Sequence, residues 1–500
     1  MHDSFWSMLP FLIVIPLSIW TRQVLPGLTV GLLIGAYMLH PSLLGGIDAT
    51  LSYLLKEVAI PDNLRLILFL YGFGAFVGLV RVTGGVSGFA RWMEERVRTV
   101  RGAFAVVWTS SLITFMAPDF RIITVAPVIK QVFERLKVPA NRVAFVIDLT
   151  ATPLTAIVPI GTAFVGYMVA LIASSNRQHA VAGTAYQLFL QSLPFNFFSW
   201  AMLIYGLYAT FFSRTSPAPE KKQISNQIRM TAETRLRIAG EIGTTEVAKE
   251  LTPSHRAIYE HEEFPDAVEL VSESITPNLL NLALPLGFLL VLTLWLTWWD
   301  GHLRAATFWG ALAAANAAKA MLEALIITLL VSFAWYAVQR QPISRTLFGF
   351  LAGGNEMLGV IVLLVLVWSV SSVSTDLGFI TYTERTIGRL VPPAFIAPVL
   401  FVFGSAISYV IGSSFGTWGI LLPLGFSLAM STHASLPLIA GAVFASGTFG
   451  GFASPLSDNT VAMSTVMKLP LMGYARMKLK AALPVAAVCT LFYTVAGFVM

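Results

Sequence analysis

Residues 447–467 read GTFGGFASPLSDNTVAMSTVM within a strongly apolar part of the chain. Glycines, a proline, several hydroxyl side chains and Asp458 interrupt the apolar pattern there. In hydrocarbon, irregular polar backbone is tolerated only where it packs inside the protein or lines a cavity. An ionisable residue in such a segment indicates a functional site. The stretch therefore predicts a helix that breaks at mid-membrane depth, with Asp458 and nearby hydroxyls facing a small substrate.

The composition of the whole chain points to the same class of protein. Of 500 residues, 56% are hydrophobic and 12% are charged, and the mean hydropathy is +0.75. These values are typical of polytopic membrane proteins. The formal net charge of +6 is interpreted as basic loops on one side of a membrane, because no basic stripe interleaved with aromatics suggests nucleic-acid binding. The single cysteine, Cys489, excludes an intramolecular disulfide.

Apolar runs long enough to cross a bilayer recur along the chain. Uninterrupted spans are predicted at 4–21, 24–40, 62–81, 186–212, 278–299, 319–338, 355–375 and 480–499. The first of these has neither a basic leader nor a cleavage site, so we expect it to be retained. Re-entrant hairpins are predicted at 102–132 and 393–430, with tips near 117–121 and 412–417. Prolines and glycines in 141–173 and 437–467 predict two broken spans.

One long polar segment, residues 213–277, separates two halves of the chain. It has too few apolar residues to form a core of its own. We expect a cytoplasmic linker, and a plain connector is favoured over a regulatory element. The predicted organisation is a first transmembrane repeat at 1–212 and a second at 278–500.

The distribution of Lys and Arg predicts that the two halves are inverted. The loop after the first hairpin, 130–142, has four of them, and the matching loop at 427–437 has none. After the broken span the bias reverses, with one at 174–184 and four at 468–480. Equivalent loops then lie on opposite sides of the membrane. The predicted fold is an all-α polytopic membrane protein with an inverted repeat, each half having a re-entrant hairpin and a broken transmembrane helix.

Three segments resemble the NhaC-type Na+/H+ antiporter family, in which the final break reads roughly G-x-F-G-D-x-x-S-P-I-S-D-T-T. Here Ser454-Pro455-Leu456-Ser457-Asp458 matches the core of that pattern. Gly451 stands where the pattern has Asp, and Asn459 stands where it has its first Thr. The other matched residues are Asp148, Thr150 and Pro153 within 143–159, and Ser414, Gly416 and Thr417 within 412–423. Glu356 lies just before a predicted span, in a G-x-x-E-M-like segment that also resembles the family.

The resemblance implies the fold of the ion transporter superfamily and Na+/H+ antiport by alternating access. It implies Na+ and H+ as the transported ions, no bound cofactor, a lipid bilayer of the prokaryotic plasma (inner) membrane, and a homodimer. The sequence has no G-x-x-x-x-G-K-[ST] nucleotide-binding motif. We therefore expect an ion gradient to supply the energy, and we do not expect an enzyme.

Na+ is a hard ion that binds carboxylate, hydroxyl and carbonyl oxygens, and an unwound helix supplies such carbonyls. The candidate ligands are Asp458, Ser457, Ser454 and Thr460 in the second half, Asp148 and Thr150 in the first, and Ser414, Thr417, Asp119 and Arg121 at the hairpin tips. Na+ itself is expected at Asp458 and Asp148. Antiport follows if the cation and a proton compete for one carboxylate. Three structural interpretations stay open, since Asp458 could cap a helix, Asp148 could pair with a basic residue, and Asp119 could pair with Arg121.

Two features leave another substrate open. Gly451 removes a negative charge from the family pattern, and Arg121 adds a positive charge suited to a carboxylate. The alternative function is a Na+- or H+-coupled transporter of a carboxylate or amino acid in the same fold. A more distant alternative is a non-transporting membrane scaffold that acts through 213–277. Polar broken helices argue against the scaffold, which has no need of them.

Overall fold

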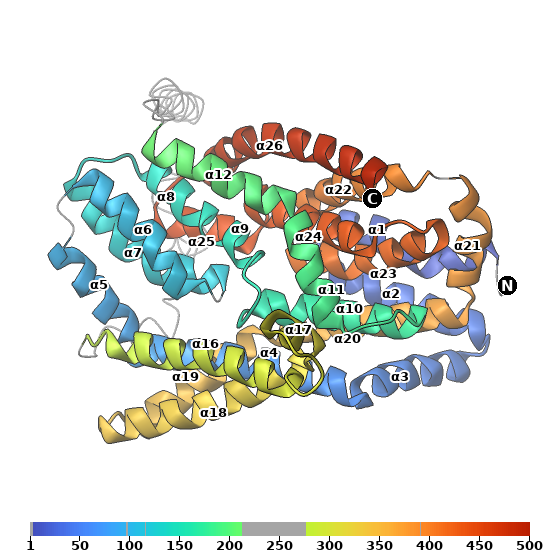
Figure 1. Cartoon of the computed structure of the whole chain (residues 1–500), viewed down its shortest axis with the longest axis horizontal. Helices are drawn as coiled ribbons and strands as arrows, with labels where there is room; N and C mark the ends of the chain where they lie inside the picture. The colour runs from blue at the N-terminus through green and yellow to red at the C-terminus, as the bar shows by residue number, and fades with distance from the viewer. Residues whose placement is uncertain (1–3, 97–98, 116, 213–276, 391) are drawn as a thin grey trace, which may run out of the picture.

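The computed structural model describes residues 4–96, 99–115, 117–212, 277–390 and 392–500 (Figure 1). These described residues form helices and no strands. Within these residues, eight helical stretches are long and apolar enough to cross a membrane, and a pair bent by 46°, Ala185–Phe195 with Phe197–Phe211, could be a ninth. The chain is an all-α polytopic membrane protein, as the sequence predicts. The linker expected at 213–277 falls almost entirely outside the described residues.

Most of the predicted uninterrupted spans correspond to helices with similar bounds. They are α1 (Leu9–Thr21) after the short η1 (Phe5–Met8), α2 (Val24–Leu39), α4 (Pro61–Val82), the series α11 (Ala185–Ser192), η2 (Leu193–Phe195) and α12 (Phe197–Phe211), α16 (Leu280–Gly301), α18 (Ala317–Val338) and α20 (Leu358–Asp376). Five further helices have no counterpart among the predictions: α3 (Leu43–Ala59), α5 (Gly85–Arg96), α17 (Phe308–Ala314), α19 (Ile343–Glu356) and α21 (Phe379–Leu390). In α3, charged residues such as Asp48, Lys56 and Glu57 hide the apolar pattern.

The order of elements in the first half recurs in the second. From α4 or α20 the chain passes through a left-handed glycine, Gly84 (φ +79°) or Gly378 (φ +86°), into α5 (Gly85–Arg96) or α21 (Phe379–Leu390). A helical hairpin follows in each half, formed by α6 (Val100–Thr114) with α7 (Pro118–Arg135), or by α22 (Pro393–Ile411) with α23 (Ser414–Thr432). Each hairpin ends next to a left-handed residue, Lys137 or His433. This recurrence is what the predicted inverted repeat requires.

The first hairpin turns earlier than the predicted tip at 117–121. Helix α7 already begins at Pro118, a residue favoured at the first helical position because its missing N–H would be unpaired there anyway. Arg121 therefore lies in the first turn of α7 and not on the tip. The second hairpin turns within the predicted 412–417, at the left-handed Gly412 (φ +80°).

Both broken helices are interrupted close to their prolines, as predicted. The first consists of α8 (Ala140–Leu149), α9 (Thr152–Thr155) and α10 (Ala163–His179), and the second of α24 (Leu436–Ala453) and α25 (Asp458–Val466). Helix α24 lies at the centre of the molecule and packs against α22, α23 and α26 (Figure 1). A Cβ atom on Gly447 would lie 2.1 Å from the Trp418 Nε1 atom, so only glycine allows this close packing.

The last helix is longer than predicted. A basic loop was expected at 468–480 before a span at 480–499, but α26 covers Leu471–Val499. Its buried side chains form one stripe: Tyr474, Ala475, Lys478, Ala482, Cys489 and Tyr493. Lys478 is therefore part of the protein core. It is not one of the exposed loop charges that indicate which side of the membrane a loop lies on, so residues 468–480 have three such charges and not four.

Helices α4 and α19 cross in direct backbone contact and join the two halves. Gly74 and Gly78 of α4 face Gly349 and Gly353 of α19, and a Cβ on Gly78 would lie 2.1 Å from the Gly349 carbonyl oxygen. Small residues four positions apart allow such approach between membrane helices. At the edge of this crossing, the Arg81 guanidinium lies 2.7 Å from the Glu356 carboxylate.

Candidate functional site

The two helix breaks lie against each other. Thr152 opens α9 just before Pro153, whose ring removes a backbone donor and prevents α8 from continuing. In the second half, Pro455 separates α24 from α25, and the Ser457 hydroxyl caps α25 by accepting a bond from the Thr460 N–H at 3.2 Å. Across the gap, the Asn459 side-chain N–H donates to the Thr152 hydroxyl at 2.9 Å. Each break thus contributes polar atoms to one shared region.

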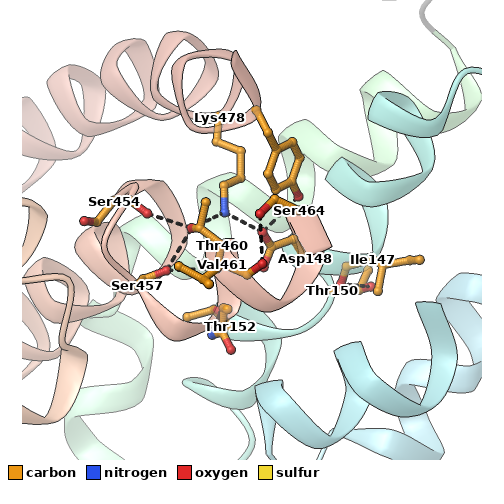
Figure 2. Close-up of polar contacts among 12 residues, drawn as sticks. Ile147, Asp148, Thr150, Thr152, Ser454, Ser457, Thr460, Val461, Ser464 and Lys478 are labelled. Atoms are coloured by element: carbon orange, nitrogen blue, oxygen red, sulfur yellow. Dashed lines mark hydrogen bonds and ion pairs between the residues drawn. The ribbon is translucent and has the colours of Figure 1, made fainter. Parts of the chain in front are cut away.

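A buried ion pair joins the first break to the last helix. The Lys478 ammonium of α26 lies 2.5 Å from the Asp148 carboxylate of α8, and both side chains have 0% exposure. The Tyr474 hydroxyl, one helical turn before Lys478, donates to the same carboxylate oxygen, Oδ2, at 3.0 Å. Figure 2 shows Lys478 and Asp148 pointing toward each other from separate elements. The pair is electrically neutral and shielded from solvent.

Thr460 connects this pair to the second break. Lys478 Nζ donates to the Thr460 hydroxyl at 2.7 Å, and that hydroxyl lies 2.7 Å from the Ser454 carbonyl oxygen (Figure 2). The Ser457 hydroxyl is 2.8 Å from the same Thr460 oxygen. Through these contacts, the polar atoms of α8, α25 and α26 form one network, which we call the Asp148–Lys478 cluster.

The Asp148–Lys478 cluster can exchange one positive charge for another. A charge buried away from water is tolerated when it is paired and hydrogen-bonded. If Lys478 loses its proton, the Asp148 carboxylate needs another cation to balance it. A proton or a small metal ion meets that need, so the geometry suits a site that binds the two alternately.

Arg121 forms a second buried polar group, beside the first break. Its side chain has 0% exposure. Its Nη2 atom donates to the Thr150 hydroxyl at 2.8 Å and to the Val107 carbonyl at 2.7 Å, and Nη1 donates to the Thr114 hydroxyl at 2.6 Å. Further contacts reach Ser110 and, through Nε, again Thr150. The guanidinium therefore joins the first hairpin to the end of α8 through hydrogen bonds. Its N–H donors are all used within the protein.

Asp458, the expected centre of the site, occupies a different environment. It is the first residue of α25, and its side chain is exposed. Among the described residues, no hydrogen bond or ion pair to its carboxylate is present. The helix cap is Ser457 and not Asp458. Of the two expected Na+ carboxylates, the structure places Asp148 in the polar cluster. The side chain of Asp119 lies outside the described part, so its pairing with Arg121 stays a prediction.

The remaining predicted hydroxyls donate to backbone carbonyls, either of a neighbouring segment or of their own helix. Ser414 donates to the Gly447 carbonyl at 2.9 Å, Thr417 donates to the Ser413 carbonyl of its own helix at 2.9 Å, and Ser454 donates to the Tyr409 carbonyl at 2.6 Å. Their hydrogen atoms are used within the protein. Thr150 likewise faces Arg121 and its own helix. The structure thus gathers Asp148, Thr460 and Ser457, with the Ser454 carbonyl, into one cluster.

Lys478 and Tyr474 are absent from the residues predicted from sequence. The basic character of 468–480 favoured a loop, and this concealed the helical spacing. Tyr474, Lys478 and Ala482 recur every four residues, which is the signal of one helix face. A lysine on that face, continuous with the apolar residues of the final span, could have indicated a buried charge.

The described residues form a helical, multi-pass fold with two facing helix breaks and a buried charge pair beside them, which is the architecture of a secondary transporter. The sequence profile of the Na+/H+ antiporter family matches residues 161–498. The chain belongs to this family, and it is an integral multi-pass membrane protein.

The individual proteins that this chain resembles share limited sequence identity with it. The chain is 25% identical over 516 aligned positions to an uncharacterized protein of Haemophilus influenzae, and the alignment covers 99% of this chain and 91% of that protein. It is 32% identical over 109 residues to the malate-2H(+)/Na(+)-lactate antiporter of Bacillus subtilis, covering 21% and 23% of the two chains. The Alcanivorax borkumensis YdaH transporter superimposes with a TM-score of 0.46 at 13% identity, covering 90% of this chain and 87% of that one.

Proposed function

We propose that the protein exchanges Na+ for H+ by alternating access, with Asp148 and Lys478 as the exchange pair. The observation that supports this proposal is a fully buried carboxylate–ammonium pair between two helix breaks. The family supports ion-coupled transport in general. We further propose that the protein works in a prokaryotic inner membrane as a homodimer, with Na+ and H+ as substrates and no bound cofactor.

The exchange follows from charge balance at Asp148. With Lys478 protonated, its ammonium neutralises the carboxylate, and a second cation would be repelled. When Lys478 releases its proton to one side of the membrane, the carboxylate is left unbalanced and binds Na+. When Na+ leaves to the other side, Lys478 must be protonated again, because an unpaired buried carboxylate is costly. Each Na+ bound at this pair therefore replaces a proton.

Proton movement in reconstituted vesicles tests the proposal. A pH-sensitive dye is enclosed, and Na+, Li+ or K+ is added outside. We expect a Na+-dependent pH change in the wild type and its loss in Asp148→Asn, which removes the charge with little change in volume. A Lys480→Met variant, at an exposed position of the same helix, serves as the control. Wild-type exchange in Asp148→Asn would overturn the proposal.

A second candidate function is coupled transport of a small carboxylate. Among the described side chains with 0% exposure, Arg121 and Lys478 carry two positive charges and Asp148 one negative charge, and a net positive core favours an anion. The partial relative in Bacillus subtilis is named for malate and lactate. If no cation changes the internal pH, uptake of labelled carboxylates and amino acids under a Na+ gradient becomes the deciding measurement. Uptake that Lys478→Gln abolishes would support this second function.

A further inference from the structure

Two buried oxygen atoms in the polar core have no hydrogen-bond partner among the described residues. One is Asp148 Oδ1, because both Lys478 and Tyr474 use the other carboxylate oxygen. The second is Asn459 Oδ1, whose residue is only 8% exposed. Buried acceptors in folded proteins are almost always paired, so an unpaired one indicates a missing water, ion or functional role. Two such oxygens at the facing helix breaks indicate a bound cation, which accepts the lone pairs of oxygen ligands.

The amide of Asn459 is held by the first break. Its Nδ2 atom donates to the Thr152 hydroxyl at 2.9 Å, which leaves the Oδ1 atom as the free end. The next residue, Thr460, is linked to Asp148 through the Lys478 ammonium. The neighbouring residues Asn459 and Thr460 of α25 are thus linked to Thr152 and Asp148, which stand four positions apart on either side of the first break. The unpaired oxygen of Asp148 therefore belongs to the first break, and that of Asn459 belongs to the start of α25, which is hydrogen-bonded to it.

Both departures from the family pattern converge on Thr152. Asn459, in place of the pattern's Thr, donates to its hydroxyl. A Cβ on Gly451, where the pattern has Asp, would lie 3.4 Å from the Thr152 Cγ2 atom and 2.2 Å from the Ser414 hydroxyl oxygen. A carboxylate at position 451 would therefore enter this same region. Here that negative charge is absent, and Asn459 brings a neutral oxygen instead.

We propose that Asp148 Oδ1, Asn459 Oδ1 and the Thr152 hydroxyl bind a small monovalent cation such as Na+ or Li+. This inference rests on the proposed cation exchange and names its ligands. Oxygen ligands suit hard cations, and divalent ions such as Ca2+ draw on several carboxylates. One carboxylate with two neutral oxygens matches a single positive charge. With Gly451 in place of the pattern's Asp, Asp148 is the charged ligand of this set, and Asn459 supplies a neutral oxygen beside it.

Equilibrium binding of radioactive Na+ to purified protein in detergent, at a pH that deprotonates lysine, tests the site without proton flux. We expect Asn459→Leu to weaken Na+ binding at least tenfold, because it replaces the amide oxygen by a methyl group of similar size. Asn459→Thr, which restores an oxygen and the family residue, should stay within a few-fold of the wild type. Ser446→Ala is the control, since that buried hydroxyl bonds only to its own helix in the described residues.

The charge of the site provides a second measurement. Asn459→Asp adds a carboxylate, so we expect Ca2+ and Mg2+ to compete with Na+ in this variant and not in the wild type. Wild-type Na+ affinity in a folded Asn459→Leu protein would overturn the inference. Unchanged divalent competition in Asn459→Asp would also overturn it, and this variant decides the question if Asn459→Leu does not fold.

Failure of this inference differs from failure of the proposed function. If Asn459→Leu binds Na+ normally while Asp148→Asn abolishes exchange in vesicles, the exchange pair stands and Asn459 is not a ligand. If Asn459→Leu weakens Na+ binding but wild-type vesicles show no Na+-dependent proton movement, the site stands and the antiport proposal fails.

Discussion

At the scale of single residues, Lys478 and Asp148 depend on each other. Each is fully buried, and each is the charge partner of the other. Removing one partner of a buried ion pair leaves an uncompensated charge and costs about 3–5 kcal/mol, whereas replacing both by apolar groups is often close to neutral. The two residues should therefore be coupled in stability as well as in transport.

We expect Lys478→Met to lower the free energy of unfolding by about 3–5 kcal/mol and the double variant Lys478→Met with Asp148→Leu to recover most of it. Denaturation of the protein in detergent micelles measures both. Lys480→Met, exposed on the same helix, should change stability little. A double variant no more stable than the single one would contradict the coupling.

At the scale of helices, glycine decides how closely elements approach. Helices α4 and α19 touch through Gly78 and Gly349, where a Cβ on Gly78 would collide with a backbone carbonyl. A rigid backbone cannot move aside as the end of a side chain can. In contrast, a Cβ on Gly359 of α20 would have no heavy atom within 4 Å. The same substitution should therefore have opposite effects at these two glycines.

Gly78→Ala should separate α4 from α19 and destabilise the protein by about 1–3 kcal/mol, the usual cost of overpacking. Gly359→Ala should be neutral or slightly stabilising, because alanine is a better helix former than glycine. Thermal melting in detergent compares the two variants. Equal melting temperatures for both would show that the close crossing does not limit stability.

At the scale of the whole molecule, an inverted repeat with this order of helices predicts that equivalent loops lie on opposite membrane faces. The loop between α7 and α8 and the helix ends beside it have Arg135, Lys137 and Arg142, whereas residues 427–437, around the loop between α23 and α24, have no Lys or Arg. Before α26 the excess of basic residues is smaller, since Lys478 is buried in the core. Topology therefore depends most on the two loops that follow the hairpins.

Cysteine labelling tests this orientation. The single native cysteine, Cys489, is buried, so the wild type should not react with a membrane-impermeant maleimide. Glu134→Cys, near the end of α7, should react only from the cytoplasmic side. Ala434→Cys, in the equivalent loop of the second half, should react only from the outside. Labelling of both from the same face would contradict the inverted repeat.

Much of the fold could be predicted because its signals are local. Long apolar runs gave the spans, and Pro153 and Pro455 marked the helix breaks within a few residues. The amphipathic α3 and the short α17 lack an uninterrupted apolar run, which explains their omission. The start of α7 was misplaced because Pro118 suits the first turn of a helix as well as a hairpin tip.

The sequence by itself determined that this protein crosses a membrane, that two of its helices break, and that Asp148, Ser457 and Thr460 lie beside those breaks. Only the tertiary structure decided that Asp148, and not Asp458, lies in the buried cluster, and that Lys478 is its partner. Hydropathy and helix breaking are properties of neighbouring residues. The pairing of two charges 330 positions apart depends on how α8 and α26 pack in space, and no local pattern records that.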